Sequence, residues 1–143
     1  MAERKGQCMC GAVKFTAQSV PDTYGACHCE MCRRWTGAAL VAATVPAKGI
    51  TWTGVEKIRK VQSSDWAERA FCRTCGSHLY YHLKFHDHFA LSAGLFQDAK
   101  ITKLSQQIFI DEKPDFYELA NDTPMLTGEE ALAAFEAANT DDA

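Results

Sequence analysis

The sequence predicts a mainly β protein of short antiparallel strands with one C-terminal helix. Short apolar or alternating segments recur at close spacing along most of the chain, which is typical of an all-β body. A capping-box pattern near the end of the chain marks the one helix that we expect. The chain has 143 residues, the size of one ordinary domain. We therefore expect a single domain over residues 1–143, with its core at about 6–138.

The expected strands are identified by their side-chain patterns. Residues 11–17 alternate apolar Val13 and Phe15 with polar neighbours, as in a half-buried strand. Residues 38–45 form a small, β-branched apolar run that ends at Pro46, as expected of a buried strand. Further strands are expected at 50–54, 55–61, 89–92 and 107–110, and extended segments at 66–71 and 79–83 lead into and out of a cysteine pair.

The expected helix follows Thr127. Glu130 stands three residues later, which is the capping-box spacing. The apolar residues of this helix share one face, which we expect to dock on the sheet: Ala131, Leu132, Phe135 and Ala138. Packing is the role that this pattern favours.

Composition and charge exclude several classes of protein. Lys plus Arg is 15 and Asp plus Glu is 18, a net charge of −3, which argues against charge-driven binding of nucleic acid. The N-terminus has no apolar signal region. The longest apolar run, 38–45, is far shorter than the span of about 20 residues that crosses a membrane. We expect a cytoplasmic protein with no membrane partner, in which thiols stay reduced.

Seven cysteines are the most informative residues of the chain. They fall in three tight groups, which are Cys8 and Cys10, then Cys27, Cys29 and Cys32, then Cys72 and Cys75. Core packing has no reason to place cysteines two or three residues apart, whereas chelation of a metal ion does. An odd number of cysteines also fits a disulfide framework poorly. Zinc is the expected metal for closely spaced thiolates, and we expect two ions per chain.

The first and last groups form pairs, each followed by a glycine, Gly11 and Gly76. A pair of thiolates is incomplete for a structural zinc, which takes four ligands, so the two pairs complete each other. We assign Cys8, Cys10, Cys72 and Cys75 to one closed, structural zinc. The alternative is that these cysteines are small buried apolar residues.

The middle group offers three thiolates, from Cys27, Cys29 and Cys32, on one short turn. Three protein ligands and one vacant position describe a catalytic zinc, and a thiol that enters this position is held as its nucleophilic thiolate. The alternative is a fourth protein ligand that closes the site, and spacing alone does not decide between the two. For His28, inside the group, we expect an orienting or exposed role.

Several residues near these groups have two interpretations. Arg33, Arg34 and Arg73 are either anchors for the carboxylates of an anionic thiol or solvated surface charges. Trp35 and Trp52 either line a pocket or pack in the core. The sequence names no substrate-binding residue and no general base.

These motifs, taken in order, resemble one protein family. They are Cys-x-Cys-Gly at 8–11, Cys-His-Cys-x-x-Cys-Arg at 27–33 followed by Thr36 and Gly37, and Phe-Cys-x-x-Cys-Gly-Ser at 71–77. They are similar to those of the glutathione-dependent formaldehyde-activating enzyme (GFA) family, which includes centromere protein V-like proteins. The similarity continues through 92–95 and 108–114, so that it covers roughly residues 6 to 126.

The resemblance implies a β-tent fold with two zinc sites. It implies that Cys8, Cys10, Cys72 and Cys75 hold the structural zinc, and that Cys27, Cys29 and Cys32 hold the catalytic one. The activity it implies is that of S-(hydroxymethyl)glutathione synthase, a carbon–sulfur lyase that joins glutathione, the expected small thiol partner, to formaldehyde. The competing hypothesis is a non-enzymatic zinc module that binds a protein partner or senses thiols or metals.

Overall fold

The computed structural model describes residues 2–97, 101 and 103–141 of the chain. These residues divide into two compact units, one of Met1–Tyr24 and Ala42–Lys103 and the other of Gly25–Val41 and Leu104–Ala143. The described residues contain eleven strands, so the mainly β class with a C-terminal helix is confirmed. The single-domain organisation stays a prediction.

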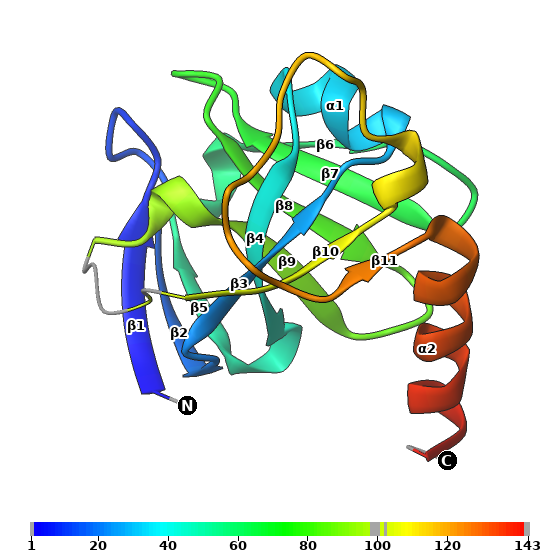
Figure 1. Cartoon of the computed structure of the whole chain (residues 1–143). Helices are drawn as coiled ribbons and strands as arrows, with labels where there is room; N and C mark the ends of the chain where they lie inside the picture. Colours follow the sequence, from blue (N-terminus) through cyan, green and yellow to red (C-terminus); the bar gives the residue numbers. More distant parts are fainter. Residues whose placement is uncertain (1, 98–100, 102, 142–143) are drawn as a thin grey trace. The chain divides into compact units, whose positions relative to one another are not determined.

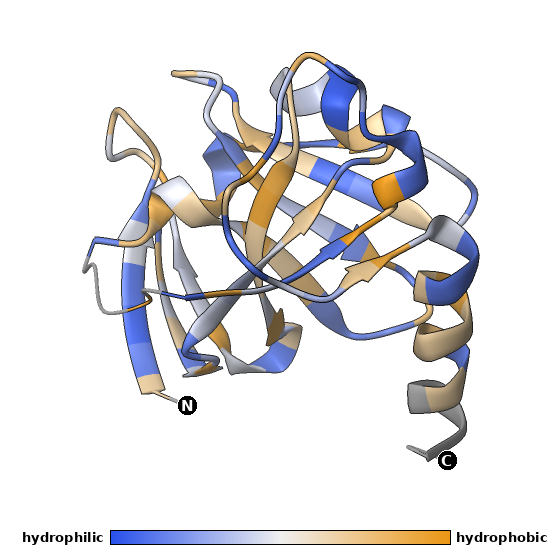
Figure 2. Cartoon of the chain, in the orientation of Figure 1, coloured by the Kyte–Doolittle hydropathy of each residue, from blue (hydrophilic) through white to orange (hydrophobic). Residues whose placement is uncertain are grey.

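A three-stranded antiparallel sheet begins the first unit. It contains β1 (Ala2–Gln7), β2 (Lys14–Val20) and β5 (Ile50–Thr53), with β2 in the centre. Edge strand β1 is hydrophilic along its middle (Figure 2), where Glu3 and Lys5 are exposed. Charged side chains on an edge strand hinder pairing with another chain. β2 begins only at Lys14, later than expected, because residues 8–13 form a closed loop that carries two of the cysteines.

Five more strands of the first unit pair in antiparallel fashion, in the order β4, β9, β8, β7, β6 (Figure 1). Their bounds are β4 (Leu40–Pro46), β9 (His88–Ser92), β8 (His78–Leu83), β7 (Ala67–Cys72) and β6 (Ile58–Gln62). These confirm the strands expected at 38–45, 66–71, 79–83 and 89–92. The strand expected at 55–61 starts at Ile58 because residues 55–57 form a 3₁₀ turn.

The core of the first unit combines small aliphatic side chains with an aromatic group. Leu79, Leu91 and Val45 are fully buried. The ring of Tyr80 stacks on Phe89 at a centroid distance of 4.2 Å, and Trp52 lies 5.5 Å from Tyr80. Of the two interpretations of Trp52, core packing is therefore the one observed.

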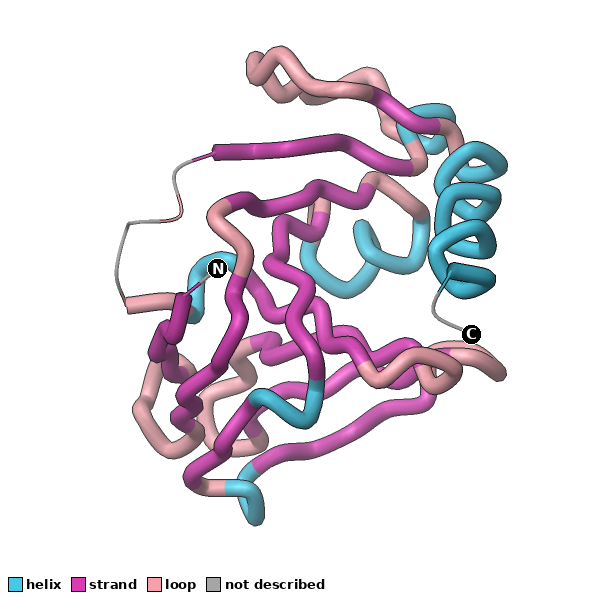
Figure 3. The backbone as a smooth tube through the Cα atoms, turned by 90° about the horizontal axis from the view of Figure 1, so that it is seen from below, coloured by secondary structure: helices cyan, strands magenta, loops and turns pink. Residues whose placement is uncertain are grey.

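The second unit contains β3 (Thr23–Cys27), α1 (Glu30–Thr36), β10 (Lys103–Ile108), β11 (Met125–Leu126) and α2 (Gly128–Asp141). Its strands follow the order β11, β10, β3, and β10 and β11 are parallel, an exception to the antiparallel expectation. Of the two α-helices in the described residues, α2 is the longer, and it runs toward the C-terminus in Figure 3. The sequence analysis did not predict β1, β3, β11 or α1.

The start of α2 is the capping box that the sequence predicts. The Glu130 N–H donates to Thr127 Oγ1 at 3.1 Å, and the Thr127 N–H donates to Glu130 Oε1 at 3.0 Å. The Gly128 N–H also donates to a carboxylate, Asp111 Oδ1, at 2.8 Å. These three bonds satisfy N–H groups that have no partner within the helix.

The expectation that the apolar face of α2 docks on the sheet is wrong. Leu132 is 58% exposed and Phe135 is 44% exposed, and the side chain of Ala138 lies outside the described residues. The start of the helix is tied to the preceding segment by the Asp111 carboxylate, and the helix also contacts β11. Neither described helix is long and apolar enough to cross a membrane.

Candidate metal centres

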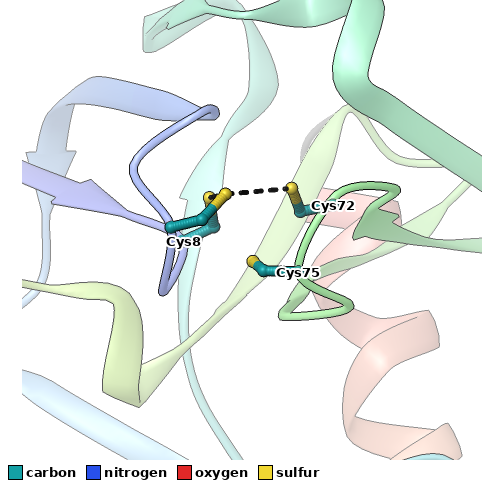
Figure 4. A group of neighbouring side chains, drawn as sticks. Cys8, Cys72 and Cys75 are labelled. Atoms are coloured by element: carbon teal, nitrogen blue, oxygen red, sulfur yellow. Dashed lines mark hydrogen bonds between the residues drawn. The ribbon is translucent and has the colours of Figure 1, made fainter.

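Four cysteines of the first unit converge on one point. Cys8 and Cys10 lie on the loop between β1 and β2, while Cys72 ends β7 and Cys75 lies in the turn that leads to β8. Their four sulfurs lie within 4.8 Å of one another. Figure 4 shows Cys8 facing Cys72 and Cys75 from the opposite loop. We call these residues the four-cysteine cluster.

Both loops of this cluster close in the same way. The N–H of the first cysteine donates to the carbonyl five residues later, Cys8 to Val13 and Cys72 to Ser77, each at 3.0 Å. Such a bond draws the chain back on itself, so that both cysteines of a pair face the same point. The glycine after each pair makes the turn possible, since the backbone there is left-handed, with φ of 80° at Gly11 and 78° at Gly76.

N–H and O–H groups stabilise two sulfurs of the cluster, those of Cys8 and Cys75, as thiolates. The Val13 N–H donates to Cys8 Sγ at 3.3 Å, and Ser77 Oγ lies 3.2 Å from Cys75 Sγ. Burial raises the pKa of Cys75, but the hydroxyl and N–H of Ser77 outweigh burial and lower this pKa to about 5. At Cys8, burial likewise raises the pKa, and the hydrogen bond from Val13 contributes to a net lowering. The thiolate is the form that binds metals.

The sulfur of Cys10 shows why a cation would stabilise this arrangement. The Ala12 N–H lowers the pKa of Cys10. Desolvation and the adjacent sulfurs raise this pKa by more than the N–H lowers it, so that the net value is about 11. Thiolates this close repel one another, and a divalent cation among them removes the repulsion. The protein therefore leaves the negative charge of the sulfurs unneutralised, and a bound metal ion would neutralise it.

The distances in the four-cysteine cluster fit zinc. Four sulfurs bound tetrahedrally at about 2.3 Å are separated from one another by about 3.8 Å. Cys8 Sγ lies 3.6 Å from Cys10 Sγ, and Cys10 Sγ lies 3.9 Å from Cys72 Sγ. The alternative of four small buried apolar residues does not explain Cys10, which is exposed.

The other three cysteines meet where a strand becomes a helix in the second unit. Cys27 ends β3, Cys29 is the N-cap of α1, and Cys32 lies in the first turn of this helix. Their sulfurs lie within 4.8 Å of one another. Cys29 Sγ accepts a hydrogen bond from the Cys32 N–H at 3.4 Å, so the thiol takes the place of the usual Ser or Asp cap. We call these residues the three-cysteine cluster.

A cation would also stabilise the three-cysteine cluster. The Cys29 and Cys32 sulfurs, together with burial, raise the pKa of Cys27 far above its ordinary value. Within the described residues, no His, Asp or Glu side chain joins the three sulfurs. The donor set of three thiolates suits zinc.

His28, between two of these cysteines, is fully buried. The orienting role is the one observed, and the expectation of an exposed side chain is wrong. Its Nδ1 lies 2.8 Å from Tyr117 Oη, and its Nε2 lies 2.8 Å from Gln107 Oε1. The backbone is held as well, because the His28 N–H donates to the Ile108 carbonyl at 3.1 Å. His28 therefore fixes the segment that carries Cys27 and Cys29.

A chain of hydrogen bonds sets the proton position on His28. Thr123 Oγ1 donates to the Pro124 carbonyl and so accepts from Gln107 Nε2, at 3.2 Å. Gln107 Oε1 then accepts the His28 Nε2–H, and Nδ1 shares the second hydrogen bond with the Tyr117 hydroxyl. Burial is the main cause that raises the pKa of Tyr117, so its phenol stays protonated.

The three arginines differ in their surroundings. Arg34 pairs with Glu30 on the exposed side of α1, with Nη2 at 2.6 Å from Oε1. Arg33 Nε donates to the His28 carbonyl at 2.9 Å. Arg73 belongs to the first unit, where its backbone N–H donates to the Lys57 carbonyl. Trp35 is half-buried on α1.

Sequence reasoning missed the partners of His28. Gln107 falls in an expected strand, and a polar residue on the buried side of a strand is a signal that it has a specific partner. Nothing in the sequence near Tyr117 marks its contact with His28, since 89 positions separate the two residues.

Comparison with known proteins identifies the family of this chain. The family model described as glutathione-dependent formaldehyde-activating enzyme matches residues 3–112. An uncharacterized lyase of Schizosaccharomyces pombe is 34% identical over 133 residues, which cover 92% of this chain and 96% of the relative. A crystal structure of a Rhodobacter sphaeroides protein matches with a TM-score of 0.58 and 25% identity, over 66% of this chain and 89% of that one. The chain is a member of the glutathione-dependent formaldehyde-activating enzyme family.

Proposed function

We propose that this protein is a zinc-dependent enzyme of the carbon–sulfur lyase type that acts on a small thiol, as S-(hydroxymethyl)glutathione synthase does. Membership of the family and the relative named as a lyase support an enzyme of this type. The observation that carries the proposal is the contrast in sulfur number, four in one cluster and three in the other. Three protein ligands leave a position for substrate.

In the proposed reaction, the thiol of glutathione adds to the carbonyl carbon of formaldehyde. A carbon–sulfur bond forms, the carbonyl π bond breaks, and the proton lost by the thiol ends on the new hydroxyl oxygen. Zinc held by Cys27, Cys29 and Cys32 would supply thiol activation and orientation, with polarisation of the carbonyl as a variant. Zinc held by the four-cysteine cluster would be structural.

The residues of the chain keep the three-cysteine cluster in place. Cys29 and Cys32 are held by the first turn of α1, and Cys27 is held by β3. His28 is buried with both ring nitrogens engaged, so its role is to hold this segment and not to carry the proton of the thiol. We further propose two zinc ions per chain, a cytoplasmic location, and no nucleic-acid or membrane partner.

The test is exchange NMR spectroscopy of glutathione with formaldehyde, with and without the zinc-loaded protein. Because the two compounds also combine without an enzyme, the measured quantity is the increase in exchange rate per mole of protein. We expect acceleration that disappears after chelation and returns with zinc. No acceleration at any ratio of protein to substrate would exclude this reaction and favour the non-catalytic zinc module.

A further inference from the structure

Helix α1 presents two adjacent faces, and Arg33 lies between them. At 100° per residue, Cys29, Cys32 and Thr36 fall on one face, whereas Glu30, Arg34 and Gly37 fall on the next. Arg33 lies at the boundary, one turn after Cys29, and its N–H donates to the Cys29 carbonyl at 3.0 Å. Its guanidinium lies beside the segment that carries the sulfurs, because Arg33 Nε donates at 2.9 Å to the carbonyl of His28, the residue between Cys27 and Cys29.

The second of these faces borders a shallow depression. Its volume is about 360 Å³, and it is lined by Glu30, Arg33, Arg34, Gly37 and Phe116. The Phe116 ring is 73% exposed and provides an apolar wall for a ligand. The depression thus combines two guanidinium groups with one exposed aromatic ring.

The two arginines are not equivalent in this depression. Arg34 Nε and Nη2 both donate to Glu30 Oε1, at 2.9 Å and 2.6 Å, so the charge of Arg34 is already matched. Arg33 uses only Nε, toward the His28 carbonyl, and no described residue bonds to its Nη atoms. This bond fixes the guanidinium plane and leaves its other edge available to a carboxylate, the geometry of charge-assisted recognition.

Two carboxylates near Arg33 have other partners. The Glu30 carboxylate is paired with Arg34, and Glu112 Oε1 accepts the Glu30 N–H at 3.2 Å. Neither carboxylate is bonded to Arg33. The net preference at the Arg33 end of the depression is therefore for an anion.

We propose that Arg33 is a specificity-determining residue, which binds a carboxylate of the substrate and restricts the enzyme to carboxylate-bearing thiols, with the Phe116 ring as the apolar wall of the site. This inference rests on the proposed function, since it assumes that a thiol binds at the three-cysteine cluster. Arg34 belongs to the same depression but contributes little to this preference, because Glu30 neutralises it.

The test measures binding without any reaction. Isothermal titration calorimetry of the zinc-loaded protein compares glutathione with glutathione diethyl ester, whose thiol is intact and whose carboxylates are blocked. The variants are Arg33→Gln, which removes the charge and keeps a donor for the His28 carbonyl, Arg33→Lys, which keeps the charge without the planar fork, and Arg34→Gln as the matched control. Thermal unfolding and zinc content confirm that each variant is folded and loaded.

We expect the unaltered protein to bind glutathione more tightly than the ester. Arg33→Gln should weaken glutathione binding by about 10- to 100-fold, the usual effect of losing a charge-assisted hydrogen bond, and leave the ester unchanged. Arg33→Lys should lie between, and Arg34→Gln should change neither affinity by more than about twofold.

Three outcomes would overturn the inference. These are equal or undetectable binding of the two probes by the unaltered protein, an equal loss for both probes in Arg33→Gln, and an equal loss of glutathione binding in Arg33→Gln and Arg34→Gln. The proposed reaction fails by a different measurement, because absence of catalytic exchange with formaldehyde leaves these affinities unaffected.

Discussion

The two cysteine clusters are built in opposite ways. The four-cysteine cluster joins two loops that lie far apart in the sequence, and each loop is closed by its own backbone hydrogen bond. The three-cysteine cluster takes all its sulfurs from one turn of six residues, and the buried His28 within this turn is hydrogen-bonded to Gln107 and Tyr117 outside it. The first arrangement would surround a metal ion with protein ligands, while the second would supply three, which in our proposal leaves a position for substrate.

This difference predicts that the four-cysteine cluster contributes mainly to stability and the three-cysteine cluster mainly to catalysis. A metal ion that connects two distant loops contributes to folding, because those loops are not together in the unfolded chain. A metal ion on one local turn connects little that is distant in sequence, so its removal should affect activity more than folding. The following predictions test this division.

The largest effect on stability is expected from Cys72→Ser. Loss of one sulfur from the four-cysteine cluster should lower the free energy of unfolding by several kcal/mol, on the order of 4 kcal/mol. For a chain of this length, this corresponds to a fall in Tm of about 10–15 °C. Thermal unfolding with metal analysis measures both quantities. A Tm close to that of the unaltered protein would show that this cluster is not a structural anchor.

Cys29→Ser should have the opposite profile. Serine is a preferred N-cap, so α1 keeps its cap and the free energy of unfolding should fall by less than about 1 kcal/mol. Catalysed exchange between glutathione and formaldehyde should be lost, together with one of the two zinc ions. A large loss of stability in this variant would instead make the second metal structural as well.

Alanine substitutions at two glycines allow the packing of the two regions to be compared. Gly54 and Gly37 both have left-handed backbones, with φ of 83° and 99°, so alanine costs about 1–2 kcal/mol at either position. At Gly54, an added Cβ would also overlap the Ala12 carbonyl in the first cysteine loop, whereas at Gly37 it would meet nothing within 4 Å. We expect Gly54→Ala to lower the free energy of unfolding by about 2–4 kcal/mol, roughly twice the effect of Gly37→Ala. Denaturant unfolding measures both, and equal losses would contradict the difference in packing.

Tyr117→Phe should have a smaller effect on metal binding than Cys29→Ser. This change removes the hydroxyl that is hydrogen-bonded to His28 Nδ1 and leaves that buried nitrogen without its partner, at a cost of about 1–2 kcal/mol. Chelator competition should release one zinc ion faster than in the unaltered protein and leave the other unchanged. The control is Phe116→Leu, which changes the adjacent exposed ring and should not alter the release rate. If zinc were released at the same rate from Tyr117→Phe and from the unaltered protein, the orientation of His28 would not contribute to metal binding at this site.

Most of the strands and both cysteine clusters could be predicted from local patterns. Alternation at Val13 and Phe15 and the β-branched run ending at Pro46 identify strands because side-chain burial in a sheet has a period of two. The capping box of Thr127 and Glu130 formed as expected because its partners are three residues apart. Strand β1, in contrast, carries Glu3, Arg4 and Lys5 and has no apolar alternation, so only its pairing with β2 makes it a strand.

The sequence alone determined which sulfurs are available and how they are grouped. Two cysteines separated by one or two residues and followed by a glycine form a local motif, so their ability to bind metal can be inferred without knowledge of the fold. Only the tertiary structure decided what surrounds the sulfurs, because those contacts join residues far apart in the chain. Gln107 and Tyr117 reach His28 across 79 and 89 positions, and the apolar side of α2 stays exposed despite its pattern. Hydrogen bonding and burial at such separations depend on how strands are ordered in space, which local patterns do not specify.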